Sequence, residues 1–281
     1  MTNEKFPVDF PKNLSLPFFT YGIFKPGQIA YSRIEKYVYD FFPSQINYRM
    51  LIRDGVPLIN PDKSEHSKTD GFLIKFKEKS SKKAYKTICI TEPKELYEWK
   101  VIKVGDIKAN VLVGKNHTIG SSSIEGNYGY YDGQKDPFFD EAIRVVEKEL
   151  DREFKGMGDM EGFLKLQMAY ILLWTSIERY CSLKYDIFGS KINKLSRDWI
   201  FRKGLKRYVN EKRTVFSADD LRDYTLNPEE PYDSVRYYYT IRCNVAHRGK
   251  AIYADEKMLR QSLEELLNIY KDILDDTFNK D

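Results

Sequence analysis

Hydrophobic residues in the first 115 positions occur in short runs, whereas beyond residue 136 they recur at the spacing of a helix. The short runs are rich in aromatic and β-branched residues and are separated by Pro, Gly, Asn and Asp, which predicts β-strands. Their close spacing predicts an antiparallel sheet or small barrel rather than repeated βαβ units. A short helix is expected at 80–90. The predicted strands are LPFFTYGIF (16–24), YRMLI (48–52), DGFLIKF (70–76), EWKVIKV (98–104) and KANVLVG (108–114).

Six segments beyond residue 136 carry helical signals. The first, 136–150, starts with an Asp at the N-cap and Pro137 at the first helical position. The second, 161–185, is apolar nearly all round, so we expect a central, buried helix. The others are a short basic segment at 197–209, a capping pattern at 217–225, a helix at 234–247 that is expected to stop at Gly249, and an amphipathic helix at 255–278.

Residues 116–135 are dominated by Gly, Ser and Asn and show no apolar period, which is typical of a linker or long loop. We therefore expect an α+β chain with two domains. A small antiparallel β-barrel is predicted for residues 1–115 and an all-α helical bundle for residues 136–281.

Composition adds few restrictions. A length of 281 residues fits two ordinary domains, and 42% hydrophobic residues suffice for packed cores. The net charge of +4 permits a polyanionic partner without indicating one. Cys89, Cys181 and Cys243 are too far apart for a disulfide framework or zinc site. The most apolar run, 169–174, is too short to span a membrane, so we expect a cytoplasmic protein without a membrane partner.

A first candidate site follows the first predicted strand, at Tyr21-Gly22-Ile23-Phe24. Glycine directly after a strand adopts backbone angles that other residues avoid, and the N–H groups of such a turn can converge on an anion. The alternative, which this segment taken alone favours, is a plain β-turn.

The segment FFTYGIFKPGQ (18–28) resembles the opening of gamma-glutamylcyclotransferase-like proteins. The resemblance continues in DGFLIKF (70–76), AYKTICITEP (84–93) and LYEWKVIKV (96–104), and it covers about residues 16–115. It implies the barrel fold and a small gamma-glutamyl-like ligand. That ligand would be held by Tyr21, Gly22, Ile23, Phe24 and Tyr97.

In that family a glutamate moves protons while the substrate's α-amine attacks the γ-amide carbonyl and 5-oxoproline is released. The resemblance places this role on Glu92. A buried carboxyl beside an apolar strand has a raised pKa, which suits proton transfer near neutral pH. Alternatively, Glu92 caps a turn before Pro93.

A second candidate site lies at Arg242, Asn244 and His247. Histidine exchanges protons near pH 7 and arginine holds phosphate with its planar fork, so the pair suits RNA cleavage by the RNA's own 2′-hydroxyl, without a metal. Arg242 and His247 are about 140° apart around a helix, so a tight pair needs a bend, the reach of Arg, or a second subunit. Alternatively, His247 binds the last carbonyls of its helix.

The segment YYYTIRCNVAHRGKA (237–251) resembles the Arg-x4-His segment of HEPN domains. The resemblance covers about residues 137–278 and implies a helical bundle, commonly a homodimer and often an RNase in toxin or defence systems. It makes Arg242 and His247 the catalytic pair, with Asn244 as a polar helper. Glu178, on the preceding long helix, is a candidate for positioning a site residue.

The basic stretch at 197–213 offers further contacts to RNA, since its aromatic residues Trp199, Phe201 and Tyr208 can stack on bases. A solvated helix face with its aromatic residues in the core is the alternative. The predicted RNA-binding residues are Arg202, Lys203, Lys206, Arg207, Arg248 and Lys250.

Together these patterns favour RNA cleavage or RNA binding by the helical half, with the barrel as a small-molecule sensor or partner module. An alternative is a gamma-glutamylcyclotransferase-like enzyme whose helical half serves dimerisation. A third is an interaction protein in which both sites are inactive. No cofactor or metal is expected, and RNA and a second copy of the chain are the expected partners.

Overall fold

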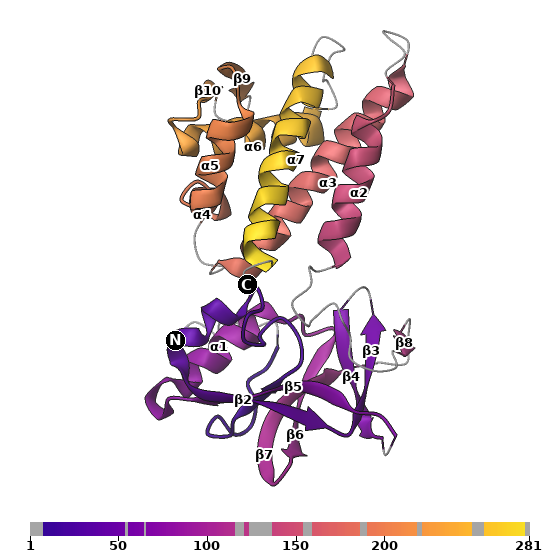
Figure 1. The fold of residues 1–281 in the computed structure, drawn as a ribbon, viewed down its shortest axis with the longest axis vertical. Coiled ribbons are helices and arrows are strands. Elements are labelled where there is room, and N and C mark those ends of the chain that lie inside the picture. The colour runs from indigo at the N-terminus through magenta and orange to yellow at the C-terminus, as the bar shows by residue number, and fades with distance from the viewer. Residues whose placement is uncertain are drawn as a thin grey trace. The chain divides into compact units, whose positions relative to one another are not determined.

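The structure is a computed structural model in which the chain divides into two compact units, Met1–Asp136 and Pro137–Asp281 (Figure 1). The division falls at the end of the segment 116–135, and since only 121–123 of that segment are described, its role as a linker stays a prediction. The structure describes residues 8–53, 56–64, 66–115, 121–123, 137–153, 159–185, 190–217, 221–248 and 256–278.

The first unit is built on a five-stranded mixed sheet. The three-residue strand β1 lies at its centre, antiparallel to β5 and parallel to β7. Parallel pairing is possible because a long stretch of chain separates β1 from β7. In sheet order the strands are β2 (Val38–Ile46), β5 (Thr69–Phe76), β1 (Phe18–Thr20), β7 (Ile107–Gly114) and β6 (Tyr97–Val104).

A second, three-stranded antiparallel sheet is formed by β4 (Val56–Lys63), β3 (Tyr48–Arg53) and β8 (Ser121–Ser123). The predicted antiparallel barrel is therefore wrong in two respects. The main sheet is mixed, because β1 pairs in parallel with β7. Its edge strands β2 and β6 approach each other but are not paired within the described residues, so no closed barrel forms.

Helix α1 (Ser81–Thr91) covers the core of this unit. It buries Ala84, Tyr85, Ile88 and Cys89, which share one face of the helix. The Tyr85 ring packs edge-on against Phe18, Phe76 and Trp99, and its hydroxyl donates a hydrogen bond to the carbonyl of Leu16. Three short 3-10 turns complete the unit at Tyr31–Arg33, Glu35–Tyr37 and Glu78–Ser80.

Gly71 allows β5 to approach β1 closely. A Cβ atom at this position would lie 2.3 Å from the backbone oxygen of Thr20 and 2.6 Å from the ring of Phe19. Real Cβ atoms do not approach other atoms so closely, and the nearest one belongs to the backbone of the central strand. Only glycine therefore fits here.

The second unit contains helices at the predicted segments 136–150, 161–185, 197–209, 234–247 and 255–278. Helix α3 is the most buried, and α7 packs against α2, α3, α5 and α6. Asp159 and Asp198 cap α3 and α5, since their carboxylates accept hydrogen bonds from backbone N–H groups of the first turn. The helices are α2 (Pro137–Leu150), α3 (Met160–Lys184), α4 (Lys191–Leu195), α5 (Trp199–Tyr208), α6 (Pro231–Arg248) and α7 (Glu256–Phe278).

A β-hairpin interrupts the helices and corrects two predictions. Strands β9 (Arg213–Ser217) and β10 (Arg222–Leu226) pair antiparallel, so this half is not all-α and the segment 217–225 does not begin a helix. Along the hairpin, Val215, Tyr224 and Leu226 are buried while Thr214 and Phe216 are exposed. This alternation follows the period of a strand and places the apolar face on α6.

No described helix combines the length and apolarity needed to cross a bilayer, and this includes the 25-residue α3.

Candidate functional sites

The segment Tyr21–Phe24 forms a tight turn directly after β1. The N–H of Lys25 donates to the carbonyl of Gly22 at 3.0 Å, which closes a β-turn, and the N–H of Ala30 donates to Ile23 at 3.1 Å. Tyr21 and Phe24 are buried, and the Tyr21 hydroxyl donates to the carbonyl of Leu112 at 2.8 Å. The hydrogen bond from Lys25 to Gly22 thus defines a β-turn, and the side chains of Tyr21 and Phe24 anchor this turn in the core.

Pro57 of β4 is a common neighbour of Gly22 and Tyr97. The Tyr97 hydroxyl donates to the carbonyl of Pro57 at 2.7 Å, and a Cβ on Gly22 would lie 3.7 Å from the Pro57 ring. Two of the five residues expected to hold a gamma-glutamyl-like ligand therefore share a neighbour. Sequence patterns did not predict β4, so Pro57 was not among the expected residues.

Glu92 lies at the end of α1, where its N–H donates to the carbonyl of Ile88 at 3.1 Å. The next residue, Pro93, accepts hydrogen bonds from the N–H groups of Leu96 and Tyr97, which forms a turn into β6. The Glu92 side chain is 9% exposed. Burial raises the pKa of the neighbouring Cys89 thiol to about 12, and the Glu92 charge adds to this rise. Glu92 thus ends a helix, as one hypothesis expects, and is also a buried carboxyl, as the other requires.

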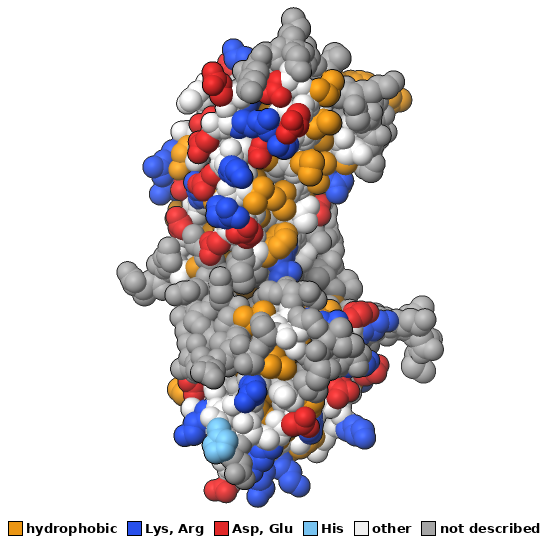
Figure 2. Space-filling model, turned by 90° about the vertical axis from the view of Figure 1, so that its right-hand side faces the viewer, with side chains coloured by type: hydrophobic (Ala, Val, Ile, Leu, Met, Phe, Trp, Pro, Cys, Tyr) orange, Lys and Arg blue, Asp and Glu red, His pale blue; other side chains and the backbone are white. Residues whose placement is uncertain are grey.

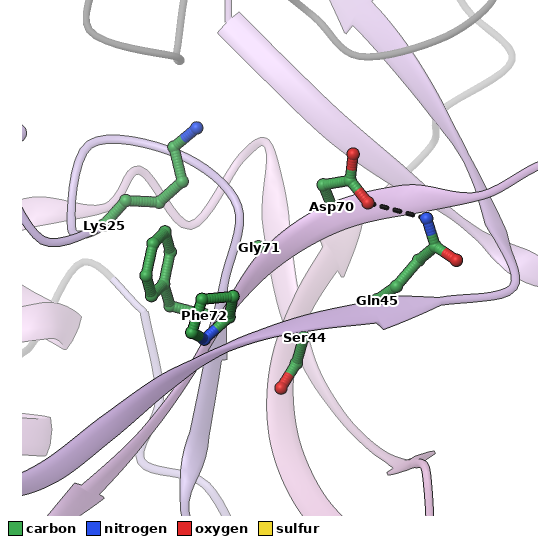
Figure 3. Close-up of a pocket in the computed structure, with 7 residues that line it drawn as sticks. Lys25, Ser44, Gln45, Asp70, Gly71 and Phe72 are labelled. Atoms are coloured by element: carbon green, nitrogen blue, oxygen red, sulfur yellow. Dashed lines mark hydrogen bonds between the residues drawn. The ribbon is translucent and has the colours of Figure 1, made fainter.

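A groove of about 520 Å³ lies beside the turn that follows β1 (Figure 3). Lys25 enters it from the turn, and Gln45 and Asp70 enter from the paired strands β2 and β5, where the Gln45 amide donates to the Asp70 carboxylate at 2.7 Å. Figure 3 shows Lys25 and Asp70 extending to the same side of the strands, whereas Ser44 points away. Sequence patterns missed this groove because β2 was not predicted.

Arg242, Asn244 and His247 all belong to the single helix α6, with His247 one residue before its end. The half-buried Arg242 guanidinium lies 5.8 Å from the centre of the Tyr239 ring. The Asn244 amide donates to the carbonyl of Phe216 at 3.0 Å and so holds β9 against α6. The side chains of His247 and Arg248, and all of Lys250, lie outside the described residues.

A cavity of about 290 Å³ lies beside Tyr239, between α3, α6 and the segment around α4. Its aromatic lining is Trp174 and Tyr239, whose ring centres are 5.6 Å apart at an angle of 53°. The Trp174 indole donates to Glu178 at 3.2 Å. The complete lining is Trp174, Ile177, Glu178, Cys181, Ser190, Leu195 and Tyr239.

The charges around this cavity act on Tyr239. Burial raises the pKa of its hydroxyl, the thiol of Cys243 and the carboxylate of Glu178 add to the rise, and the positive charge of Arg242 opposes it. A cation, a carboxylate and two aromatic rings from different helices are thus grouped in one place. Of these, Arg242 and Glu178 were proposed from the sequence, and the aromatic pair was not.

Three of the predicted RNA-binding residues on α5 have partners within the helical unit, although their side chains remain exposed. Lys206 lies 3.0 Å from the carboxylate of Glu229, and Arg207 lies 3.5 Å from that of Asp272. The Arg202 guanidinium donates to the carbonyl of Ser196 at 3.1 Å.

The three aromatic residues of this stretch are not equally accessible. Phe201 is 1% exposed, so it cannot stack on a base, and the Tyr208 hydroxyl donates to Asp272. Trp199 is 59% exposed and lies 5.8 Å from the Lys203 ammonium. On α5, Trp199 is therefore the aromatic side chain most exposed for stacking, and Arg202, Lys203, Lys206 and Arg207 are exposed as well.

No protein-family model, curated protein or solved structure matches the chain. The two resemblances therefore rest on the motifs at 18–104 and 237–251, and function has to be argued from the geometry of the sites.

Proposed function

We propose that the helical unit is a HEPN-like endoribonuclease that needs no metal, with Arg242 and His247 as its catalytic pair. The observation that carries this proposal is the position of Arg242. Its guanidinium lies 5.8 Å from the ring centre of Tyr239, which lines the aromatic cavity together with Trp174 and Glu178. Proteins recognise single-stranded RNA by combining aromatic rings for bases with cations for phosphates.

In this mechanism a 2′-hydroxyl attacks the adjacent phosphorus and the bond from phosphorus to the 5′-oxygen breaks. His247 moves a proton between these oxygens and Arg242 stabilises the negative charge of the pentacoordinate phosphorus. The products are a 2′,3′-cyclic phosphate and a 5′-hydroxyl. Since positions five residues apart lie about 140° apart around a helix axis, a second copy of the chain would supply the complementary residue.

The test compares wild-type protein with Arg242→Ala and His247→Ala on total and transfer RNA in the presence of EDTA. Each variant should lose about 10²–10⁴-fold in rate, because proton transfer or charge stabilisation is removed. Analysis of the product ends should show 2′,3′-cyclic phosphates.

Arg144→Ala and His66→Ala are matched controls. Arg144 is exposed on α2 beside Glu141, and His66 is exposed in the first unit. Both should cleave as the wild type does. Equal cleavage by all four variants would point to a contaminating nuclease or another site. RNA binding without cleavage would mean that the helical unit is an RNA-binding domain without nuclease activity.

For the first unit we propose a ligand-sensing role, supported by the groove beside Lys25 in which Asp70 and Gln45 present polar groups. The second candidate function, gamma-glutamyl cyclotransfer, is favoured by one observation. Glu92 is a buried carboxyl whose following turn leads directly to Tyr97, the next residue of the resembled motif.

A homodimer is part of the same proposal. The side chains of Met160, Leu164 and Met168 recur every four residues on α3 and are 61%, 50% and 68% exposed. In the view of Figure 2, exposed hydrophobic side chains lie along the helical unit. A continuous exposed apolar stripe is a typical protein interaction surface.

A further inference from the structure

The cavity between Trp174 and Tyr239 has a lining of distinctive chemistry. Its aromatic lining is Trp174, which is 2% exposed, and the half-buried Tyr239, and Ile177 and Leu195 add aliphatic groups. Glu178 is the one side chain with a carboxyl group among the lining residues. Such a cavity suits a flat, apolar-faced ligand with hydrogen-bond donors at one edge.

The orientation of Glu178 is fixed from within the protein. The Trp174 indole donates to Oε1 of Glu178, four residues later on the same helix. An ionised carboxylate only accepts hydrogen bonds and has about four lone-pair directions on its two oxygens. The indole uses one of them, so the carboxylate retains the capacity to accept donors from a ligand.

Among the four RNA bases, guanine presents two adjacent N–H donors, N1–H and the N2 amino group, on its Watson–Crick edge. Adenine and cytosine place an acceptor next to their amino group, and uracil has one N–H between two acceptors. A carboxylate therefore matches guanine and meets an opposing acceptor on each of the other bases.

The dimensions agree with a single base. A cavity of about 290 Å³ is at the lower end of the roughly 300–1,000 Å³ that is usual for ligand sites. Arg242 lies 5.8 Å from the ring centre of Tyr239, which lines the cavity. A nucleotide whose base stacks on Tyr239 would thus lie close to the proposed catalytic arginine.

We propose that this cavity is a guanine subsite, with Glu178 as the specificity-determining residue and Tyr239 as a stacking surface. The inference rests on the proposed RNA function of the helical unit. It predicts that RNA is bound, and cut, next to guanosine.

The test is calorimetric titration of the full-length chain with GMP, AMP, CMP and UMP. GMP should bind about tenfold or more tightly than the other three, which is the discrimination expected of a bidentate base contact. Glu178→Gln should remove this preference, because its amide NH₂ replaces one acceptor by a donor. Glu264→Gln, which changes an exposed carboxylate on α7, should bind GMP as the wild type does.

The outcomes separate the subsite from the catalytic proposal. Equal affinity for the four nucleotides, or an unchanged preference in a folded Glu178→Gln protein, overturns the guanine subsite even if RNA is cleaved. Selective GMP binding that is lost in Glu178→Gln supports the subsite even if no RNA is cleaved, in which case it is the nuclease proposal that fails. The circular dichroism of each variant establishes that it is folded.

Discussion

Glu92 combines two structural properties. It ends helix α1 and precedes a proline, and the residue is only 9% exposed. Glu92 is also the residue to which the resemblance assigns proton transfer.

Exchanging Glu92 for Gln tests this role with little change in volume. If the first unit is a cyclotransferase, Glu92→Gln should lower 5-oxoproline release from gamma-glutamyl amides by about 10²–10⁴-fold. The thermal transition of the protein should stay close to that of the wild type. Release is measured by chromatography over a panel of gamma-glutamyl amides and dipeptides.

The exposed neighbour Glu95→Gln provides the control and should retain full activity. If the wild type releases no 5-oxoproline from any member of the panel, the unit is a binding module. RNA cleavage by Glu92→Gln should equal that of the wild type in either case.

At the scale of elements, the hairpin β9–β10 depends on a buried ion pair. Arg213 of β9 contacts both carboxylate oxygens of Glu265 on α7, and the two side chains are 12% and 8% exposed. Glu265 also accepts a hydrogen bond from the hydroxyl of Tyr238 at 3.1 Å. The hairpin is thus attached to α7 by this pair and to α6 by Asn244.

Arg213→Ala should destabilise the helical unit by about 3–5 kcal/mol, because it leaves the Glu265 carboxylate buried without its cation. Urea unfolding followed by circular dichroism at 222 nm measures this loss, since the long helices belong to this unit. Lys212→Ala, which removes an exposed neighbouring charge, should change stability by less than about 0.5 kcal/mol.

The double variant Arg213→Met/Glu265→Leu separates charge from packing. It removes both charges and should recover much of the stability that Arg213→Ala loses. An Arg213→Ala protein as stable as the wild type would mean that the pair is solvated and does not hold the hairpin.

The elements that could be predicted from the sequence are those whose hydrophobic residues recur with a regular spacing within one segment. The long helices carry their apolar residues at helical spacing and start at Asp or Pro residues, so their positions agreed with the prediction. Strand β2 was missed because Pro43 lies near its middle, which argues against a strand unless it is at an edge, where β2 is found. The hairpin was not predicted because Ser217-Ala218-Asp219-Asp220 has the residue types of a helix cap.

The candidate sites were predictable only in part, for the same reason. Arg242, Asn244 and His247 form a local pattern, so the sequence was enough to select them. The pairing of Trp174 with Tyr239, and the surface ion pairs of Lys206 with Glu229 and of Arg207 with Asp272, join segments that are distant in sequence. No local pattern contains this information.

At the scale of the whole molecule, the exposed stripe of α3 predicts assembly. The chain has a mass of 33.2 kDa, so a homodimer should show twice this mass in light scattering at micromolar concentration. Leu164→Lys/Met168→Glu should shift the protein towards the monomer, because it places charges within the apolar stripe. If Arg242 and His247 act across two copies, RNA cleavage should fall with dimer content.

Tyr39→Lys is the control for this prediction. Tyr39 is 76% exposed on β2 of the first unit, outside the stripe, and its substitution should leave the mass unchanged. A wild-type protein that is strictly monomeric at micromolar concentration would remove the basis for a site shared between two copies.

The close approach at Gly71 has a consequence for the gene. Every missense change of a glycine codon introduces a Cβ, and at this position that atom would lie 2.3 Å from the backbone of the central strand. Because a backbone atom cannot move aside as a flexible side chain can, all such alleles would disturb the sheet and the groove that it lines. In a population that depends on this protein, purifying selection should therefore retain glycine at codon 71, although the residue has no functional group.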